Sequence, residues 1–416
     1  MKKKMKTIIL KPINLYLAAV ILGLLNGLYG NESLHHIAEF ISNAFIHLFK
    51  CLGAPIIAVS LITTLSSFSR SEISTAGKKT LFYTITTTTI AALTSMLLYI
   101  LIHPQTSIPN NAMTSAASQK TAYLEHIATM IPVNFFSPFI ENQVISILFI
   151  GIAIGFAIRL IPDKDSQKTV MQFFKGIQSI LFVLTKWVVT ILPIAIFGFV
   201  SVSIVQYLNG FKIESLGQYF AVIFLANLIQ GFVVLPAWLK LKGIKPFYSM
   251  KQMMPALSVA FFSKSSSGTL PLTMETAEKR LGLNQSVTRF VLPLCTTINM
   301  NGCAAFIFTT VIFIMQSNGV DISIGTMFAW VFIATIAAIG NAGVPMGCFF
   351  LSASLLTSMN MPVELLGFIL PFYNLIDMVE TSLNVWSDSC VANVVNKELT
   401  VSPQPYVIDN GQSESA

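Results

Sequence analysis

The chain contains long stretches without a charged residue, and each is apolar enough to cross a lipid bilayer. A membrane-spanning α-helix needs about 20 consecutive apolar residues. The charge-free runs of that length are Pro12 to Asn31, Cys51 to Ser69, Thr80 to Ile102, Trp187 to Phe211, Ser215 to Leu239 and Phe290 to Val320. A shorter run lies around Gln143 to Ala157. Because only 10% of the 416 residues are charged, a soluble fold is excluded and an all-α polytopic membrane protein is predicted.

The basic residues predict how the chain is oriented in the membrane. If the first apolar run is a retained helix that starts in the cytoplasm, the loops around Lys78, Arg159 and Lys240 all face the cytoplasm. Cytoplasmic loops are enriched in Lys and Arg, so this arrangement agrees with the positive-inside rule. We therefore expect a multi-pass protein of the cell (inner) membrane, in contact with lipid, with both termini cytoplasmic. The net charge of +7 reflects this orientation, and no nucleic-acid partner is expected because no soluble basic domain exists to hold one.

Cysteine spacing gives no indication of a disulfide framework or a zinc site. No two of the cysteines form a CxxC pair, and all lie within or beside apolar segments: Cys51, Cys295, Cys303, Cys348 and Cys390. Neither kind of site is therefore expected.

Two polar or glycine-rich breaks interrupt the apolar pattern of the second half. The first is the serine-rich run Phe262 to Pro271, which predicts a hairpin tip because serine, glycine and proline weaken a helix interior. The second is Ala338 to Gly347, inside the uncharged run Ile322 to Val363, and it predicts a helix followed by two half-helices. Each break alone could equally be an ordinary extramembrane loop. Together they indicate a transporter binding centre, because open backbone at membrane depth must line a cavity.

A third polar cluster, Thr296 to Cys303, lies in the middle of an apolar run. It predicts a locally unwound helix whose carbonyl groups could serve a hard monovalent cation. A packing seam of small polar residues is the alternative.

An acidic stripe marks the last apolar segment. A helix would place its members within about one third of the circumference: Asp377, Glu380, Thr381, Asn384 and Asp388. Ionisable groups at membrane depth usually face a cavity, an ion path or a partner. The alternative is a polar seam between two packed helices.

In this order, the three clusters and the stripe closely resemble the dicarboxylate/amino acid:cation symporter family, which contains glutamate, aspartate and neutral amino acid transporters. The specific resemblance covers about Met254 to Asn396, and the first half matches more loosely through Tyr83 and Leu52 to Ile56. The matching segments are Ser265 to Pro271 for the first re-entrant hairpin, Thr297 to Gly302 for the Asn-Met-Asp-Gly motif, Gly340 to Gly347 for the second hairpin, and Asp377, Thr381, Asn384 and Asp388 for the final-helix motif.

The resemblance implies eight transmembrane helices plus two re-entrant helical hairpins, assembled as a homotrimer with a glutamate-transporter-like elevator fold. Residues 1–253 would form mainly the scaffold, with the third and sixth transmembrane helices joining the transport domain. Residues 254–396 would form the transport core, and residues 397–416 a disordered cytoplasmic tail.

The resemblance also implies the site residues. Ser266 and Asn384 would hold the substrate α-carboxylate and Asp377 its α-ammonium group. The full substrate set is Ser265, Ser266, Cys303, Val344, Cys348, Asp377, Glu380, Thr381 and Asn384. The sodium ligands fall into three groups: Asp388 with Cys295, Asn299 and Asn384; Thr297, Met300, Ala338, Ile339 and Asn341; and Tyr83, Thr86, Thr87, Asn299 and Asn301.

Three departures from the family pattern bear on the substrate and the coupling ion. Glu380 stands where acidic-substrate members have an arginine, and Cys303 where they have a threonine. Because arginine pairs with a side-chain carboxylate and glutamate would repel it, a neutral or cationic amino acid is expected. The alternatives are a proton-coupled glutamate/aspartate or dicarboxylate symporter, and a Glu380 that pairs with Lys264 without touching substrate. Asn301 replaces an aspartate, so fewer sodium ions, or protons carried through Glu380, are expected as coupling ions.

Two other functions fit parts of the pattern. Ser263, Lys264 and Ser265 could be imagined as an intramembrane Ser/Lys hydrolase, but no further residues supply a triad or an oxyanion hole. Two re-entrant hairpins could build a channel, although a channel needs no amino acid cradle. We therefore expect a secondary symporter with no enzymatic activity and no organic cofactor.

Overall fold

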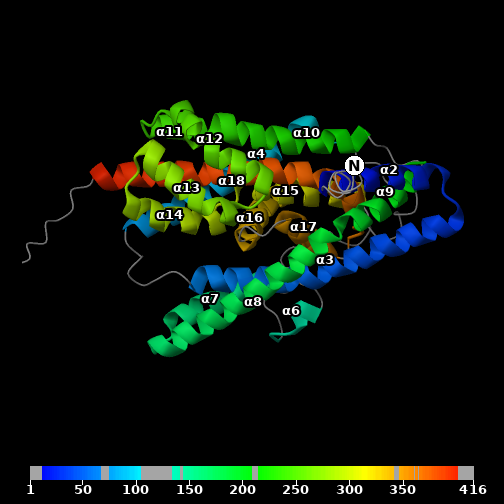
Figure 1. The fold of residues 1–416 in the computed structure, drawn as a ribbon, viewed down its shortest axis with the longest axis horizontal. Helices are drawn as coiled ribbons and strands as arrows, with labels where there is room; N and C mark the ends of the chain where they lie inside the picture. The colour runs from blue at the N-terminus through cyan, green and yellow to red at the C-terminus, as the bar shows by residue number, and fades with distance from the viewer. Residues whose placement is uncertain are drawn as a thin grey trace, which may run out of the picture.

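The computed structural model describes residues 12–66, 75–104, 134–140, 144–208, 214–341, 346–359, 361–363 and 365–401. Every element in these residues is helical, which agrees with the predicted all-α class (Figure 1). The helices are α2 Pro12–Tyr29, α3 Glu32–Ser66, α4 Thr75–Ile102, α6 Ser137–Ile140, α7 Val144–Leu160, α8 Lys164–Thr190, α9 Leu192–Leu208, α10 Glu214–Ile229, the π-helix η1 Gln230–Val234, α11 Leu235–Leu241, α12 Pro246–Ser263, α13 Ser266–Leu281, α14 Gln285–Ile298, α15 Asn301–Ser317, α16 Ile324–Gly340, α17 Gly347–Ser358 and α18 Leu365–Val401.

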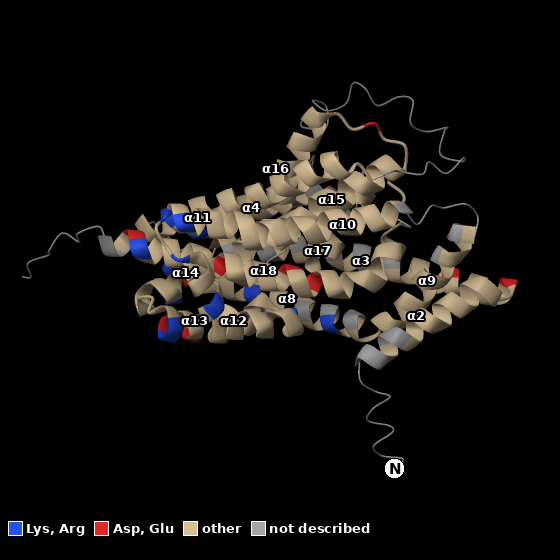
Figure 2. Ribbon diagram, turned by 90° about the horizontal axis from the view of Figure 1, so that it is seen from above, with Lys and Arg blue, Asp and Glu red and all other residues tan. Residues whose placement is uncertain are grey.

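Several helices have the length and composition of membrane spans. Among the described residues, Thr75–Ile102, Ser215–Leu241 and Gln285–Ser317 are each long and apolar enough to cross a bilayer. The pair α8 and α9, bent by 56°, adds a fourth if it is taken as one span. Lys, Arg, Asp and Glu gather at the end of the molecule where α11, α13 and α14 lie, while most of the long helices carry few charges (Figure 2). Both observations indicate a multi-pass membrane protein.

The N-terminal helices pack mainly on one another. α3 lies against α7, α8 and α9, and α2 lies against α9 (Figure 1). α3 is 35 residues long and includes Pro55, so it starts well before the apolar run at Cys51 that predicted it. The reason is that the mixed segment from Glu32 to Leu52 contains no glycine or proline.

The C-terminal helices surround α18. This 37-residue helix lies against α12, α13, α14 and α15, and also touches α9. α4 and α10, which come earlier in the chain, also pack against α15. α18 continues to Val401, past the predicted start of the tail at residue 397, and residues 402–416 are outside the described part of the chain.

The first predicted break is narrower than its sequence suggested. The chain turns between α12 and α13, which lie side by side, and only Lys264 and Ser265 are outside a helix. Lys264 adopts a left-handed backbone with φ 55°, and the Ser265 hydroxyl accepts the N–H of Gly268 at 3.0 Å. Because Ser265 caps the new helix, the rest of the serine run is the start of α13.

The second and third breaks also occur where the sequence placed them. The sequence predicted a helix and two half-helices in the run from Ile322 to Val363. The described residues of this run form two helices, α16 and α17, and α16 with its 17 residues takes up nearly the whole first half of the run. Residues 342–345 are outside the described part of the chain. Between α14 and α15, Asn299 and Met300 are non-helical, which confirms the predicted unwinding.

Candidate functional site

The breaks and the acidic stripe meet at one cavity. The segments that contribute to it are the tip before α13, the unwound stretch before α15, the end of α16, and α18. The space between these segments is small: about 240 Å³ is free of atoms, a figure that includes its opening to solvent. Its lining residues are Lys264, Ser266, Met300, Cys303, Asn341, Asp377, Thr381 and Asn384.

Helix ends give this cavity its backbone chemistry. The N-termini of α13 and α15 and the C-terminus of α16 reach its lining residues. Helix N-termini attract anions, and helix C-termini attract cations through their unpaired carbonyl groups. One small space therefore presents groups for both charges of a zwitterion.

The stripe on α18 faces the protein interior along its whole length. The residues Asp377, Glu380, Thr381, Asn384 and Asp388 are all buried. The prediction that they avoid the lipid face is therefore confirmed.

Asp377 connects α18 to the start of α17. The backbone N–H of Met346 and the Thr381 hydroxyl lie near its carboxylate. Met346 has a left-handed backbone, with φ 59°, and immediately precedes α17. A carboxylate at a helix N-terminus is favoured by the helix dipole, so Asp377 stabilises the first turn of α17.

Lys264 supplies the positive charge of the cavity wall. Its Nζ donates a hydrogen bond to Asn374 Oδ1 at 2.5 Å. The alternative in which Lys264 pairs with Glu380 is therefore wrong. The same geometry contradicts a Ser/Lys dyad, because the Ser265 hydroxyl is engaged as a helix cap.

Asn384 and Gly302 hold α18 and α15 close together. Asn384 Oδ1 accepts the Gly302 N–H at 2.9 Å, and its Nδ2 faces Cys303 Sγ at 3.6 Å. A Cβ on residue 302 would lie 2.7 Å from Glu380 Cα, so only glycine permits this approach.

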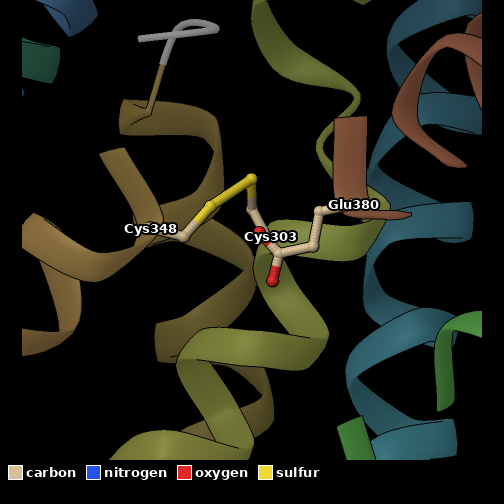
Figure 3. Close-up of side chains that lie close together, drawn as sticks. All are labelled: Cys303, Cys348 and Glu380. Carbon is tan, nitrogen blue, oxygen red and sulfur yellow. A yellow bond between two sulfur atoms is a disulfide. The ribbon is translucent and has the colours of Figure 1, made fainter. Parts of the chain in front are cut away.

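Glu380 lies behind the cavity and does not line it. Its Oε2 accepts a hydrogen bond from the Tyr373 hydroxyl at 3.4 Å, while Oε1 is buried without a hydrogen-bond partner. Figure 3 shows its carboxylate beside Cys303 and Cys348, which form a disulfide between α15 and α17. No disulfide framework was expected from the cysteine spacing, and this one pair, whose Cα atoms are 5.4 Å apart, joins two helices that are neighbours in space.

A second polar centre forms around Asp388. Asn299 Nδ2 donates to Asp388 Oδ1 at 3.0 Å, and the Thr296 hydroxyl lies 3.4 Å from Oδ2. The carbonyl of Cys295 accepts the Asn299 N–H at 2.7 Å. A carboxylate beside an unwound backbone offers oxygen ligands of the kind that hard cations prefer.

A third polar centre lies between α4, α15 and η1. The Thr87 hydroxyl and Asn301 Nδ2 donate to Asn299 Oδ1 at 3.0 and 2.8 Å. Gln230 Nε2 donates to Asn301 Oδ1 at 2.7 Å and to the Thr87 carbonyl at 3.1 Å. Our reading of the sequence missed Gln230, although Asn227 and Gln230 form a polar i, i+3 pair within an otherwise apolar run.

The remaining predicted ligands have other contacts. The Tyr83 hydroxyl donates to Glu398 Oε1 at 2.6 Å, so only its carbonyl, which accepts the Thr87 hydroxyl at 2.9 Å, faces the third centre. Thr86 and Thr297 donate to carbonyls of their own helices. The Ala338 carbonyl accepts the Asn341 N–H at 3.1 Å near the end of α16, where Ile339 also lies. Val344 is outside the described residues.

Comparison with known proteins gives the arrangement a family. The sodium:dicarboxylate symporter family matches residues 13–398 of the chain. The chain belongs to this family.

Relatives within the symporter family carry different amino acids. The chain is 28% identical to a "Proton/sodium-glutamate symport protein" of Bacillus caldotenax, over 91% of this chain and 92% of the relative. It is 27% identical to "Neutral amino acid transporter B(0)" of Bos taurus, over 87% of this chain and 73% of the relative. It is 26% identical to "Excitatory amino acid transporter 2" of Homo sapiens, over 86% of this chain and 72% of the relative. These symporter relatives are transporters and not enzymes.

Proposed function

We propose that this chain is a secondary active symporter that takes up a small amino acid with a neutral or cationic side chain, driven by a sodium gradient. The observation that carries the proposal is the single cavity that brings Asp377, Asn384 and the serine tip together. The transporter names of the relatives support the same class of function.

The cavity offers a place for each charged group of an amino acid. The substrate α-ammonium group binds the Asp377 carboxylate, assisted by Thr381. The α-carboxylate binds Asn384 Nδ2 and the N-terminus of α13 at Ser266. Carboxylates at a helix N-terminus and ammonium groups on a buried carboxylate are the favoured arrangements.

Charge balance favours a substrate that is neutral or positive overall. Lys264 and Asp377 line the cavity with one positive and one negative charge. Glu380 places a carboxyl group directly behind the wall formed by Cys303. A second carboxylate on the substrate would approach Glu380 without a matching cation there, which costs free energy in a buried environment.

Sodium is the proposed coupling ion at the Asp388 centre. The carboxylate and the opened backbone at Asn299 supply oxygen ligands next to the substrate cavity. A cation bound there neutralises Asp388 and stabilises the unwound stretch that also contributes Met300 to the cavity. Protons are the alternative coupling ion.

The family assignment supports a proposal for the larger movements. We propose a homotrimer in the cell membrane with both termini in the cytoplasm. Residues 254–396, together with α4 and α10, move as the transport domain, and α17 acts as part of the gate. Uptake coupled to a sodium gradient in fixed proportion distinguishes this elevator mechanism from a channel.

An acidic substrate is the second candidate, and Lys264 is the observation that favours it. Its ammonium group lines the cavity and is held by the neutral Asn374, so it is not neutralised by an ion pair with Glu380. In that case Lys264 binds the substrate side-chain carboxylate and the symporter carries glutamate, aspartate or a simple dicarboxylate.

A substrate screen tests both candidates. Purified protein is screened by thermal shift and by uptake into proteoliposomes, using the native chain, Glu380→Arg and Glu380→Gln. We expect native binding of neutral or cationic amino acids, and a shift towards acidic amino acids in Glu380→Arg but not in Glu380→Gln. Native uptake of glutamate or aspartate that Lys264→Gln abolishes would establish the second candidate instead.

A further inference from the structure

The third polar centre, between α4, α15 and η1, is filled by amide groups. Thr87, Asn299, Asn301 and Gln230 are all nearly inaccessible to solvent, with exposed fractions of 0–4%. The resemblance to the symporter family predicts a sodium site at this place, with an aspartate at position 301. The chain has Asn301 there and brings Gln230 against it.

Three oxygen atoms of this centre already accept hydrogen bonds. Asn299 Oδ1 receives the Asn301 amide and lies 3.0 Å from the Thr87 hydroxyl. Asn301 Oδ1 and the Thr87 carbonyl both receive the amide of Gln230. A hard cation needs several oxygen lone pairs directed at one point. Here N–H groups occupy those directions and, unlike at Asp388, no carboxylate contributes a charge, so the centre does not fit a cation.

Gln230 is held in this position by the backbone around it. It begins the π-helix η1, a type of bulge that is frequent at functional sites. The carbonyl of the next residue, Gly231, accepts the indole N–H of Trp386 at 3.0 Å, which ties η1 to α18. Gln230 Oε1 has no hydrogen-bond partner, so the amide nitrogen carries all the contacts of this side chain with the centre.

We propose that Gln230 and Asn301 act as a built-in substitute for a coupling cation, and that this symporter therefore carries one cation fewer than an aspartate at position 301 would allow. The proposal rests on the proposed function, because it concerns the ion coupling of the same transporter. Gln230 contributes to this centre through its N–H groups and not as an oxygen ligand.

Restoring a carboxylate tests the proposal. Asn301→Asp removes the amide that donates to Asn299 Oδ1 and adds a negative charge, which should create a cation site. We measure the melting temperature against the logarithm of sodium concentration without substrate, because its slope reports the number of bound cations. We expect Asn301→Asp to gain about one bound sodium. The control Asn318→Asp adds the same charge to α15 about 26 Å away along the helix and should leave the slope unchanged.

Gln230→Leu and the native protein provide readouts that do not depend on Asn301→Asp folding. If Gln230 fills the centre with N–H groups, Gln230→Leu leaves the sodium slope unchanged or raises it, and a lowered slope overturns the proposal. In crystals of the native protein soaked with thallium(I), no anomalous peak should lie between Thr87, Asn299 and Asn301, and a peak there overturns it as well. Neither readout requires transport. A protein that takes up no amino acid would therefore refute the proposed function, while the sodium slope and the thallium(I) map would still decide this inference.

Discussion

Replacing Gly302 by alanine should disrupt the site without changing any charged residue. The new Cβ would lie 2.7 Å from Cα and 2.9 Å from Cβ of Glu380. Favourable contacts between carbon atoms are about 3.5–4.0 Å long, so the overlap is about 1 Å. Because the atoms it meets are the backbone and Cβ of α18, no rotamer change relieves it, and α15 and α18 must separate.

The separation has two measurable costs. Overpacking of this kind destabilises a protein by about 1–3 kcal/mol. A displacement of about 1 Å also breaks the Gly302 N–H bond to Asn384 and misplaces two lining residues of the cavity, and misplacement on that scale costs about a hundredfold in rate for enzymes. We therefore expect Gly302→Ala to retain measurable folding and to lose at least about 90% of uptake.

The assay compares Gly302→Ala with Gly217→Ala in proteoliposomes and by thermal melting. Gly217 lies in α10, where an added Cβ meets no atom within 4 Å, so alanine there should be neutral or slightly stabilising. If Gly302→Ala took up substrate as fast as Gly217→Ala and melted at the same temperature, the close approach of α15 and α18 would be refuted.

Three further changes have defined outcomes. Reducing the Cys303–Cys348 disulfide, which joins residues 45 apart, should lower thermal stability by up to about 4 kcal/mol, and Cys348→Ser should melt identically with and without reductant. Glu398→Gln removes the carboxylate that accepts Lys242 Nζ at 2.7 Å. Because the pair is partly exposed to solvent, this variant should lose about 1 kcal/mol of stability in thermal melting. Asp388→Asn keeps the shape of the side chain but not its charge, so the sodium concentration for half-maximal uptake should rise by about tenfold or more, and an unchanged value would exclude Asp388 as a cation ligand.

The sequence predicted the features that depend on neighbouring residues. Apolar runs gave the long helices, the polar run Thr296 to Cys303 gave the unwinding at Asn299, and the spacing of the stripe gave its buried face on α18. Each of these is a local property, set by helix periodicity or by residues that weaken the helix ladder.

The sequence did not predict the contacts between distant segments. Cys303 and Cys348 pair across two helices, so their spacing contains no signal of a disulfide. Lys264 Nζ donates to the neutral Asn374 and not to the carboxylate of Glu380. Which partner it meets depends on where the side chains point in the folded state. Gln230 begins the π-helix η1 and reaches Asn301 on α15, a contact between segments 71 residues apart that the sequence does not show.

The double role of Asp377 has a thermodynamic consequence. The same carboxylate lies near the Met346 N–H at the start of α17 and forms part of the cavity wall. A ligand ammonium group that arrives there draws on the lone pairs that hold the first turn of α17, so occupancy and the position of α17 are linked. By reciprocity, if a bound ligand changes the equilibrium that holds α17 by some factor, then holding α17 changes ligand affinity by the same factor.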